Sequence, residues 1–568
     1  MVLDRVAAGP SRETCGSMPL RTPKNTPMGS SFLQNERDLL NVPGQSLLVA
    51  GGDGRMNLHP ISRLNKYGCA PEPRDVLAVG SCTASSPSPR ALQAVEEMRH
   101  ILLRAYHDGE LVAVAHEMMR EIRVELAREL ALDEVPGIQV VLTPSGTDVE
   151  MLGVSLALQG DDRRLCNIVS GPEEVGSGTT DAAAGLHFDD RTPRGGNSTV
   201  GEPVNSAMSG RVHVETIGLR DEHGQMRPEA ELNAQCRSMV DQAIARGERV
   251  MVHIVAHSKT GAHAPSLSCV RAIRAAYPDD VVVMVDAAQG RISRRGLRAA
   301  MDEGWLVLFT GSKFYAGPPF SGALFVPQNL ASPEVGIGHL PDGFHGYFTA
   351  GELPTEWDQG RANLSDDPNL GLILRWRAAL AEIKAYYAAN PSDRYEVLRA
   401  FERTVPRILE ESACVSLEDS APPVDDDGST PLLESKKTVF SFYLRPREGE
   451  EYFGVEALRN IFTWMNRDLG SCAGAFPEAV RDTLTARFHL GQPVVTSKSK
   501  DLAVLRVALG AALIVQLAED ERLGGDLASR LEWLTGRLLV LRSKLEFLAQ
   551  NYATLERTLT MDELGADQ

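Results

Sequence analysis

The sequence lacks the features that mark several classes of protein. Its eight cysteines form no Cys-x-x-Cys pair, so neither a disulfide scaffold nor a metal site is expected. No apolar stretch is long enough to span a bilayer, and the first residues lack the apolar core of a signal peptide. We therefore expect a soluble, cytoplasmic protein with no membrane partner.

Positive charge is also scarce. The chain has 58 lysines and arginines against 76 aspartates and glutamates, a formal net charge of −18. Because nucleic-acid binding needs clustered cations and no basic run is present, a nucleic-acid partner is not expected. Apolar residues make up 43% of the 568 residues, enough for a large core shared between two or three domains.

The middle of the chain alternates between helix-like and strand-like patterns. Apolar residues at three- and four-residue steps predict a helical stretch over 90–132. Continuous apolar strands between helices indicate a mostly parallel sheet covered on both faces, hence an α/β domain. Residues 190–210 are predicted to form a long loop. The predicted strands are 138–142, 166–169, 250–255, 281–285 and 306–309.

Four regions follow from these patterns. We expect a mobile N-terminal extension, a large α/β domain, a smaller C-terminal α+β domain and a terminal helix. Strand-like runs at 438–443 and 504–508 indicate the small domain, after an acidic, proline-rich linker at 419–437. Leucines at heptad spacing predict that the terminal helix packs against the body or a second subunit, with a free-standing coiled coil as the alternative. The four regions are 1–45, 46–365, 366–520 and 521–562.

Two short segments suit the binding of an aromatic phosphate. Ser145, Gly146 and Thr147 follow a predicted strand and open a helix, where hydroxyls, backbone N–H groups and the helix dipole favour a phosphate. Asp286 ends a buried strand at the edge where open α/β sheets bind ligands, and Gln289 follows it. A protonated pyridine nitrogen would compensate the buried carboxylate. Ordinary helix caps are the alternative interpretation of both segments.

A third segment contains a lysine in an unusual place. Lys313 follows Ser312 directly after another predicted strand, in a turn of glycine, serine and aromatic residues. Burial and neighbouring charge lower the pKa of a lysine in such a turn, as imine chemistry requires. A solvated surface lysine is the alternative.

Taken in this order, the three segments resemble the aminotransferase class V and cysteine desulfurase superfamily of fold-type I pyridoxal-phosphate enzymes, over roughly residues 75–510. The resemblance implies a transferase-like α/β fold, a homodimer, pyridoxal 5'-phosphate as cofactor and an amino acid as substrate. It also implies a role for each matching residue. Those expected roles are Lys313 as the catalytic Schiff-base lysine; Ser145, Gly146, Thr147 and Ser312 around the phosphate; Asp286 at the pyridine nitrogen; Gln289 at the phenolic oxygen; His257 beside the cofactor; Arg506 at the substrate α-carboxylate; and Ser85 in the substrate pocket.

The chain also departs from the pattern. Relatives usually place a histidine over the cofactor ring, but the corresponding segment, residues 170–177, contains none. This difference weighs against a desulfurase, although the loop around Cys472 resembles the sulfur-accepting loop of some relatives. A structural role is the alternative for Cys472. We expect a transformation of an amino acid through an external aldimine, with an aminotransferase favoured. The alternatives are a C–S lyase or cysteine desulfurase, a decarboxylase or other α-carbon chemistry, and a non-catalytic binding protein.

Overall fold

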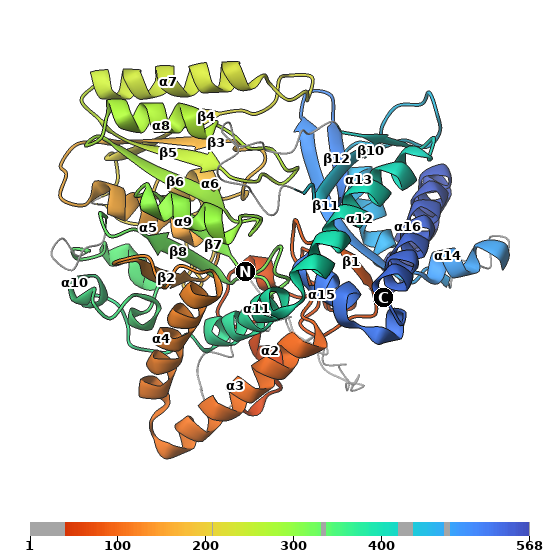
Figure 1. Cartoon of the computed structure of the whole chain (residues 1–568), viewed down its shortest axis with the longest axis horizontal. Coiled ribbons are helices and arrows are strands. Elements are labelled where there is room, and N and C mark those ends of the chain that lie inside the picture. The colour runs from red at the N-terminus through yellow and green to blue at the C-terminus, as the bar shows by residue number, and fades with distance from the viewer. Residues whose placement is uncertain (1–39, 207, 331–336, 419–435, 471–477, 567–568) are drawn as a thin grey trace, which may run out of the picture.

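The computed structural model describes residues 40–206, 208–330, 337–418, 436–470 and 478–566. Its strands form a seven-stranded and a five-stranded sheet, which lie in the left and right halves of Figure 1. The large sheet contains β2 (Gln139–Thr143), β3 (Leu165–Ser170), β4 (Val212–Ile217), β5 (Arg249–Val255), β6 (Val281–Ala287), β7 (Leu306–Thr310) and β8 (Gly322–Val326). The small sheet contains β1 (Leu77–Val79), β9 (Val415–Leu417), β10 (Val439–Leu444), β11 (Phe488–Ser497) and β12 (Leu502–Ala508).

The large sheet is mostly parallel, as the sequence predicts. Its strand order is β2-β8-β7-β6-β5-β3-β4, and only β8 runs antiparallel to its neighbours. Successive residues of a strand enter different cores: Val250 and Val252 face one cluster, whereas Met251 faces another. This alternation shows a sheet covered on both faces. The expected α/β fold, with a smaller C-terminal α+β domain, is confirmed.

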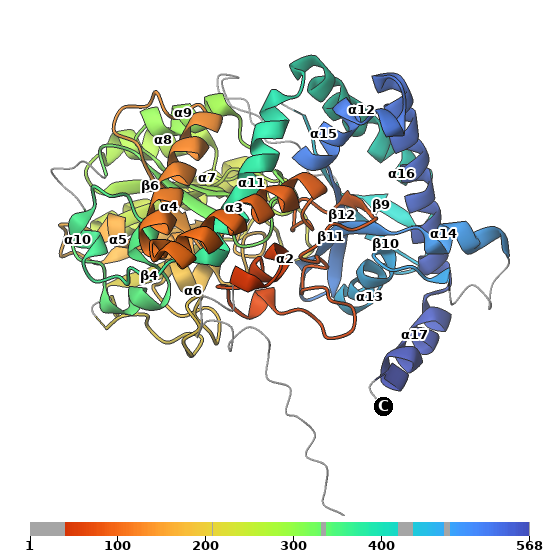
Figure 2. The same ribbon diagram turned by 90° about the horizontal axis from the view of Figure 1, so that it is seen from below.

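Helices cover the two faces of the large sheet (Figures 1 and 2). The first face is packed by α4 (Leu111–Glu129), α7 (Glu229–Ala245), α8 (Leu267–Ala276) and α9 (Arg294–Asp302); the second by α5 (Gly146–Leu158) and α6 (Thr179–Ala183). The other helices are α2 (Gly44–Leu47), α3 (Pro89–Asp108), α10 (Asp358–Arg361), α11 (Leu370–Ala388), α12 (Pro391–Glu410), α13 (Val455–Met465), α14 (Arg481–Thr485), α15 (Ala511–Glu519), α16 (Leu527–Gln550) and α17 (Tyr552–Ala566).

Some elements differ from the expectation. The helical stretch predicted over 90–132 is two helices, α3 and α4, because Gly109 ends α3 with a φ of +77°. The strands β4 and β8 are not among the predicted ones. Residues 190–206 form turns with an isolated bridge between Arg191 and Asn197, in agreement with the predicted loop.

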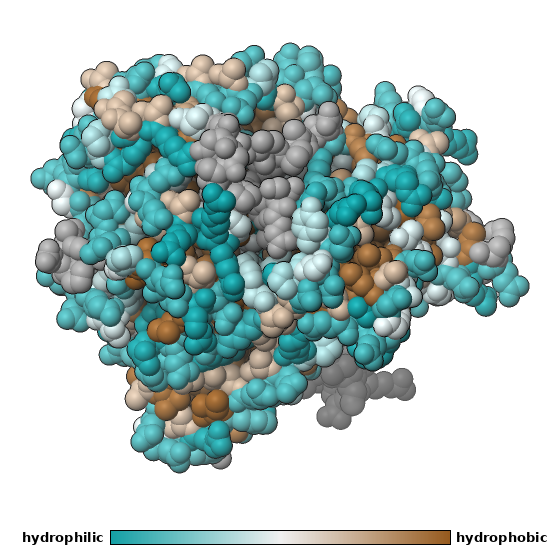
Figure 3. All heavy atoms as spheres, viewed as in Figure 1, coloured by the Kyte–Doolittle hydropathy of each residue, from teal (hydrophilic) through white to brown (hydrophobic). Residues whose placement is uncertain are grey.

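The region boundaries also shift. Leu40 and Gly44 are buried, so the part of the expected mobile extension that the structure describes packs against the body. The strand β1 lies within the expected large domain, yet it pairs with β11 of the small sheet. Most of the linker at 419–437 lies outside the described residues. Hydrophilic residues cover most of the face in Figure 3, and no described helix is long and apolar enough to cross a membrane.

The leucine heptads form the core-facing side of α16. This helix runs along the small domain in Figures 1 and 2 and packs against α12, α13, α14 and α15. Of the two alternatives, packing against the body is therefore what the structure shows. The buried leucines are Leu534, Leu538, Leu541, Leu545 and Leu548.

We expect Leu545→Ala to lower the free energy of unfolding by about 2–5 kcal/mol, because it leaves a cavity in a packed core. Leu545 is fully buried, whereas Leu539 on the same helix is 39% exposed. The matched Leu539→Ala control should therefore change stability by no more than about 0.5 kcal/mol. Denaturant midpoints measure both. Equal losses in the two variants would contradict this packing.

Candidate active site

Asp286 and Lys313 lie at the same edge of the large sheet. Asp286 is the sixth residue of β6, and Lys313 follows the neighbouring parallel strand β7. The carboxylate is 7% exposed and accepts a 2.9 Å hydrogen bond from the Ala288 N–H. The structure thus brings together the two residues that the sequence predicts for the pyridine nitrogen and the imine.

The charges of the two side chains oppose the effect of burial. Burial raises the pKa of Asp286, and the nearby Lys313 ammonium works against that rise. Burial also lowers the pKa of Lys313, and Asp286 opposes it while Arg506 and Arg291 add to it. Among the described residues, no ion pair includes Asp286, so its carboxylate is available to a cation of a ligand.

The predicted phosphate turn borders the same edge. Ser145 is the N-cap of α5, and a Cβ placed on Gly146 would lie 3.0 Å from Thr310 Cγ2 at the end of β7. Thr310 Oγ1 donates to the Ala288 carbonyl at 2.6 Å and accepts from Ser312 Oγ at 3.3 Å. The N-terminus of α5 and the residues after β6 and β7 therefore meet at one place.

Arg55 is a site residue that sequence reasoning missed. Its Nη2 donates to Ser145 Oγ at 3.1 Å, and its Nη1 donates to Thr147 Oγ1 at 3.3 Å. Asp53 holds the guanidinium through an ion pair of 2.6 Å. Phe188 and Phe320 lie over it, with ring centroids 5.4 and 4.6 Å from its Cζ. The phosphate turn therefore carries a fixed cation beside its two hydroxyls.

Asp148 adds a carboxyl group to this turn. It lies in the first turn of α5 and accepts a 2.6 Å hydrogen bond from Ser145 Oγ. Burial raises the pKa of Asp148 to about 7. Its neutral form is thus accessible near neutral pH, which is the form compatible with a phosphate alongside.

Gln289 is held by the protein itself. Its Nε2 donates to the Cys82 carbonyl at 3.0 Å, and its Oε1 accepts from Arg291 Nη1 at 2.7 Å. Arg291 is buried and also donates to Ser81 Oγ and to Thr438 Oγ1, at 2.7 and 3.0 Å. The expected contact of Gln289 with a ring oxygen stays a prediction.

Arg506 joins three segments around the site. It lies on β12 and is 2% exposed. Its guanidinium donates to the Lys259 carbonyl, to Thr83 Oγ1 and to the Gln492 carbonyl, at 2.9, 2.9 and 2.7 Å. The expected contact of Arg506 with a substrate carboxylate stays a prediction.

Ser85 shares a cavity wall with its neighbours Ser81 and Ser86. It is buried in the wall of a cavity of about 1210 Å³ whose lining includes neither Lys313 nor Arg506. Cys82 and Thr83 are the residues of this segment that approach Arg506: Gly491 lies between the Cys82 thiol and the arginine. The expected pocket segment is therefore present, with different residues facing the site.

His257 begins a turn after β5. Burial lowers its pKa to about 3, so the ring is neutral near pH 7. Glu174, from the segment in which relatives usually have a histidine, accepts from Ser258 Oγ and from Thr260 Oγ1. It also pairs with Arg220 at 2.6 Å. Glu174 therefore holds the His257 turn in place.

Lys259 is a second lysine at the site and was not predicted. Its backbone carbonyl accepts from Arg506, and Lys313 lies close enough for the two ammonium charges to repel. Burial and these cations lower the pKa of Lys259 to about 8. The site therefore favours anionic ligands. Cys472, the other residue named from the family pattern, lies outside the described residues.

No family model matches the chain, and no curated protein matches it. It is similar to solved structures that include the cysteine desulfurase group named by the sequence resemblance. A NifS-like protein is 14% identical with a TM-score of 0.48, over 84% of this chain and 99% of that one. The cysteine desulfurase from Thermococcus onnurineus NA1 is 14% identical with a TM-score of 0.45, over 83% and 95%. The Oryza sativa TDC with PLP is 13% identical with a TM-score of 0.46, over 85% of each chain.

Proposed function

We propose that this protein binds pyridoxal 5'-phosphate through Lys313 and transforms an amino acid. The observation that carries this proposal is the meeting of Lys313, Asp286 and the N-terminus of α5 at one sheet edge. A buried carboxylate, a lysine of lowered pKa and a cradle of two hydroxyls with an arginine match the ring nitrogen, aldehyde and phosphate of this cofactor. The residues present therefore fit the group.

Each residue has a distinct task in this proposal. Arg55, Ser145 and Thr147 hold the phosphate, and Asp286 accepts the hydrogen bond of the protonated ring nitrogen. The cofactor, when bound, supplies an electron sink for negative charge at the substrate α-carbon. Lys313, whose pKa is lowered by burial, is the amine that takes up and returns a proton.

Among the reactions open to such a site, we propose transamination. A guanidinium suits a carboxylate, and Arg506 at the site favours retaining that group over losing it as carbon dioxide. The segment in which the desulfurase pattern has a proton-handling histidine contains Glu174 instead. Because Glu174 is already bound to Arg220 and to the His257 turn, this segment weighs against a desulfurase. A C–S lyase or a decarboxylase is the second candidate; the similar solved structures include a cystine C–S lyase.

The test mixes protein loaded with cofactor with single amino acids, without an acceptor, and follows the visible absorption band. If one amino acid bleaches the band and a keto acid restores it, transamination is supported. If the band survives while sulfide, ammonia or carbon dioxide accumulates, transamination is excluded in favour of the second candidate. If added cofactor gives no visible band, the whole proposal fails. The proposed homodimer is tested separately by light scattering of the loaded protein.

We expect Arg55→Gln to raise the dissociation constant for pyridoxal 5'-phosphate about 10- to 100-fold, because hydrogen bonds to charged groups contribute about 1.5–3 kcal/mol. Fluorescence titration of the cofactor-free protein measures this constant. Arg63→Gln is the matched control, since Arg63 is exposed. Equal affinity in the Arg55 variant and the control would remove Arg55 from the phosphate site.

A further inference from the structure

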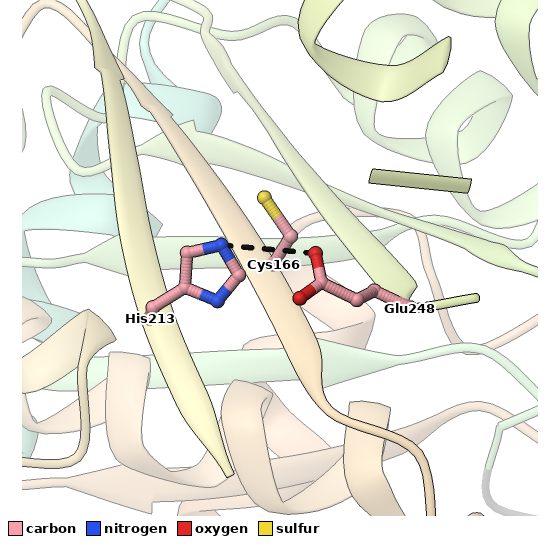
Figure 4. A group of neighbouring side chains, drawn as sticks. All are labelled: Cys166, His213 and Glu248. Carbon is pink, nitrogen blue, oxygen red and sulfur yellow. Dashed lines mark ion pairs between the residues drawn. The ribbon is translucent and has the colours of Figure 1, made fainter. Parts of the chain in front are cut away.

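A second group of chemically active side chains lies at the opposite end of the large-sheet strands, where the strands begin. Figure 4 shows His213 on β4 and Glu248 before β5 pointing toward each other, with Cys166 on β3 between them. Cys166 and His213 are the second residues of their strands, whereas Asp286 lies near the end of β6. Because these strands are parallel, this group and the site at Lys313 occupy opposite ends of the sheet.

Strand register explains why these side chains meet. Cys166 pairs with His213, and Leu165 pairs with Arg249, which follows Glu248. Cys166, His213 and Glu248 therefore project from the same face, and their sulfur, ring-nitrogen and carboxylate atoms all lie within 4.8 Å of one another. Glu215, two residues after His213, projects from this face as well, and its Oε1 lies 3.6 Å from His213 Nε2.

The arginines around this group hydrogen-bond to only some of the carboxylate oxygens of Glu215 and Glu248. Arg246 donates at 2.9 Å to Glu215 Oε1 and to Glu248 Oε2. Arg164 lies 3.8 Å from the other oxygen of Glu248, beyond hydrogen-bonding distance. The arginine thus takes one oxygen of each carboxylate, as outer partners of metal ligands commonly do. The imidazole Nε2 lies 3.6 Å from Glu215 Oε1 and 3.8 Å from Glu248 Oε2, and the Cys166 thiol interacts with Glu215.

We infer that Cys166, His213 and Glu248 bind one Zn²⁺, with Glu215 as the fourth ligand. Thiolate, imidazole and carboxylate are the ligands that zinc takes, and four protein ligands mark a structural site. Binding joins the edge strand β4, most of whose residues are partly exposed, to β3 and to the start of β5. The spacing of 47 and 35 residues between the three ligands gives no sequence motif, which is why no metal site was expected.

Cobalt is the probe, because a thiolate bound to Co²⁺ gives an intense near-ultraviolet charge-transfer band. The full chain is freed of metal with a chelator and titrated with Co²⁺. We expect one Co²⁺ per chain, the charge-transfer band, its loss when Zn²⁺ is added, and a higher thermal midpoint with Zn²⁺. Absence of the band overturns the proposal. None of these readouts depends on pyridoxal phosphate, so the result is independent of the proposed function.

Matched variants assign the ligands. Cys166→Ser should lose the band, whereas Cys414→Ser, at another buried cysteine of the core, should keep it. If Cys166→Ser does not fold, His213→Asn serves instead, because His213 is partly exposed; its control is His223→Asn, at an exposed histidine. The His213 variant should bind Co²⁺ more weakly than its control. A band that persists in Cys166→Ser, or equal binding by the two histidine variants, overturns the assignment.

Discussion

Lys313→Ala is expected to lower kcat/KM for the best amino-acid substrate by on the order of 10⁴-fold, since it removes both the covalent anchor and the proton-transferring amine. The protein should still bind pyridoxal 5'-phosphate through Arg55 and the two hydroxyls of the phosphate turn. The imine band of the wild-type protein should be missing, and an imine band should appear only when an external primary amine is supplied. Steady-state kinetics and absorption spectra measure the two effects.

The control for this variant is Lys500→Ala, since Lys500 is exposed and near Arg506 only in the sequence. Borohydride treatment of the wild-type protein followed by peptide mass spectrometry should place the cofactor on Lys313. Modification of Lys259 instead would assign the anchor to the neighbouring amine, whose pKa is lowered to about 8. That result would contradict the proposed role of Lys313.

Asp286→Asn is expected to lower kcat/KM by about 10²–10³-fold, the usual effect of removing one preorganised electrostatic partner. The amide has the shape of the carboxylate and keeps an acceptor for the Ala288 N–H, but it carries no charge to hold a proton on the ring nitrogen. Because burial disfavours the charged form of Asp286, the neutral amide should not destabilise the cofactor-free protein.

Activity and thermal midpoint of the cofactor-free protein should therefore separate in the Asp286 variant: activity falls while the midpoint stays equal or rises. Asp302→Asn, at the exposed end of α9, is the control for both measurements. Wild-type activity in Asp286→Asn would exclude a contact with the ring nitrogen. A large fall in the midpoint would instead indicate a structural role for this carboxylate.

The parts of the fold that the sequence predicts are those with a strong local signal. The strands β6 and β7 are continuous apolar runs, and Asp286 and Lys313 stand in fixed positions relative to them. The strand β4 is only partly buried because it lies at the sheet edge, so its apolar residues give no continuous run. The strand β8 is a five-residue segment whose antiparallel direction depends on tertiary pairing.

The site residues also divide into those with a local sequence signal and those that only tertiary folding brings to the site. Ser145, Gly146 and Thr147 are recognisable because turn and helix are adjacent in the chain. Arg55 reaches them across about 90 residues, and Lys259 faces Arg506 across 247. No spacing rule connects such pairs, since the folding of the N-terminal segment and of the small sheet brings them together. Cys82 and Thr83, rather than Ser85, face the site for the same reason.

The pairing of β1 with β11 sets an order for folding during synthesis. All strands of the large sheet lie between residues 139 and 326, so this sheet can form while the rest of the chain is still on the ribosome. Leu77, by contrast, pairs with Phe488. The N-terminal strand β1 therefore stays unpaired until β11 has been synthesised, and an unpaired strand edge can pair with other chains. A nascent chain that ends before residue 488 would leave residues 77–79 without their pairing strand.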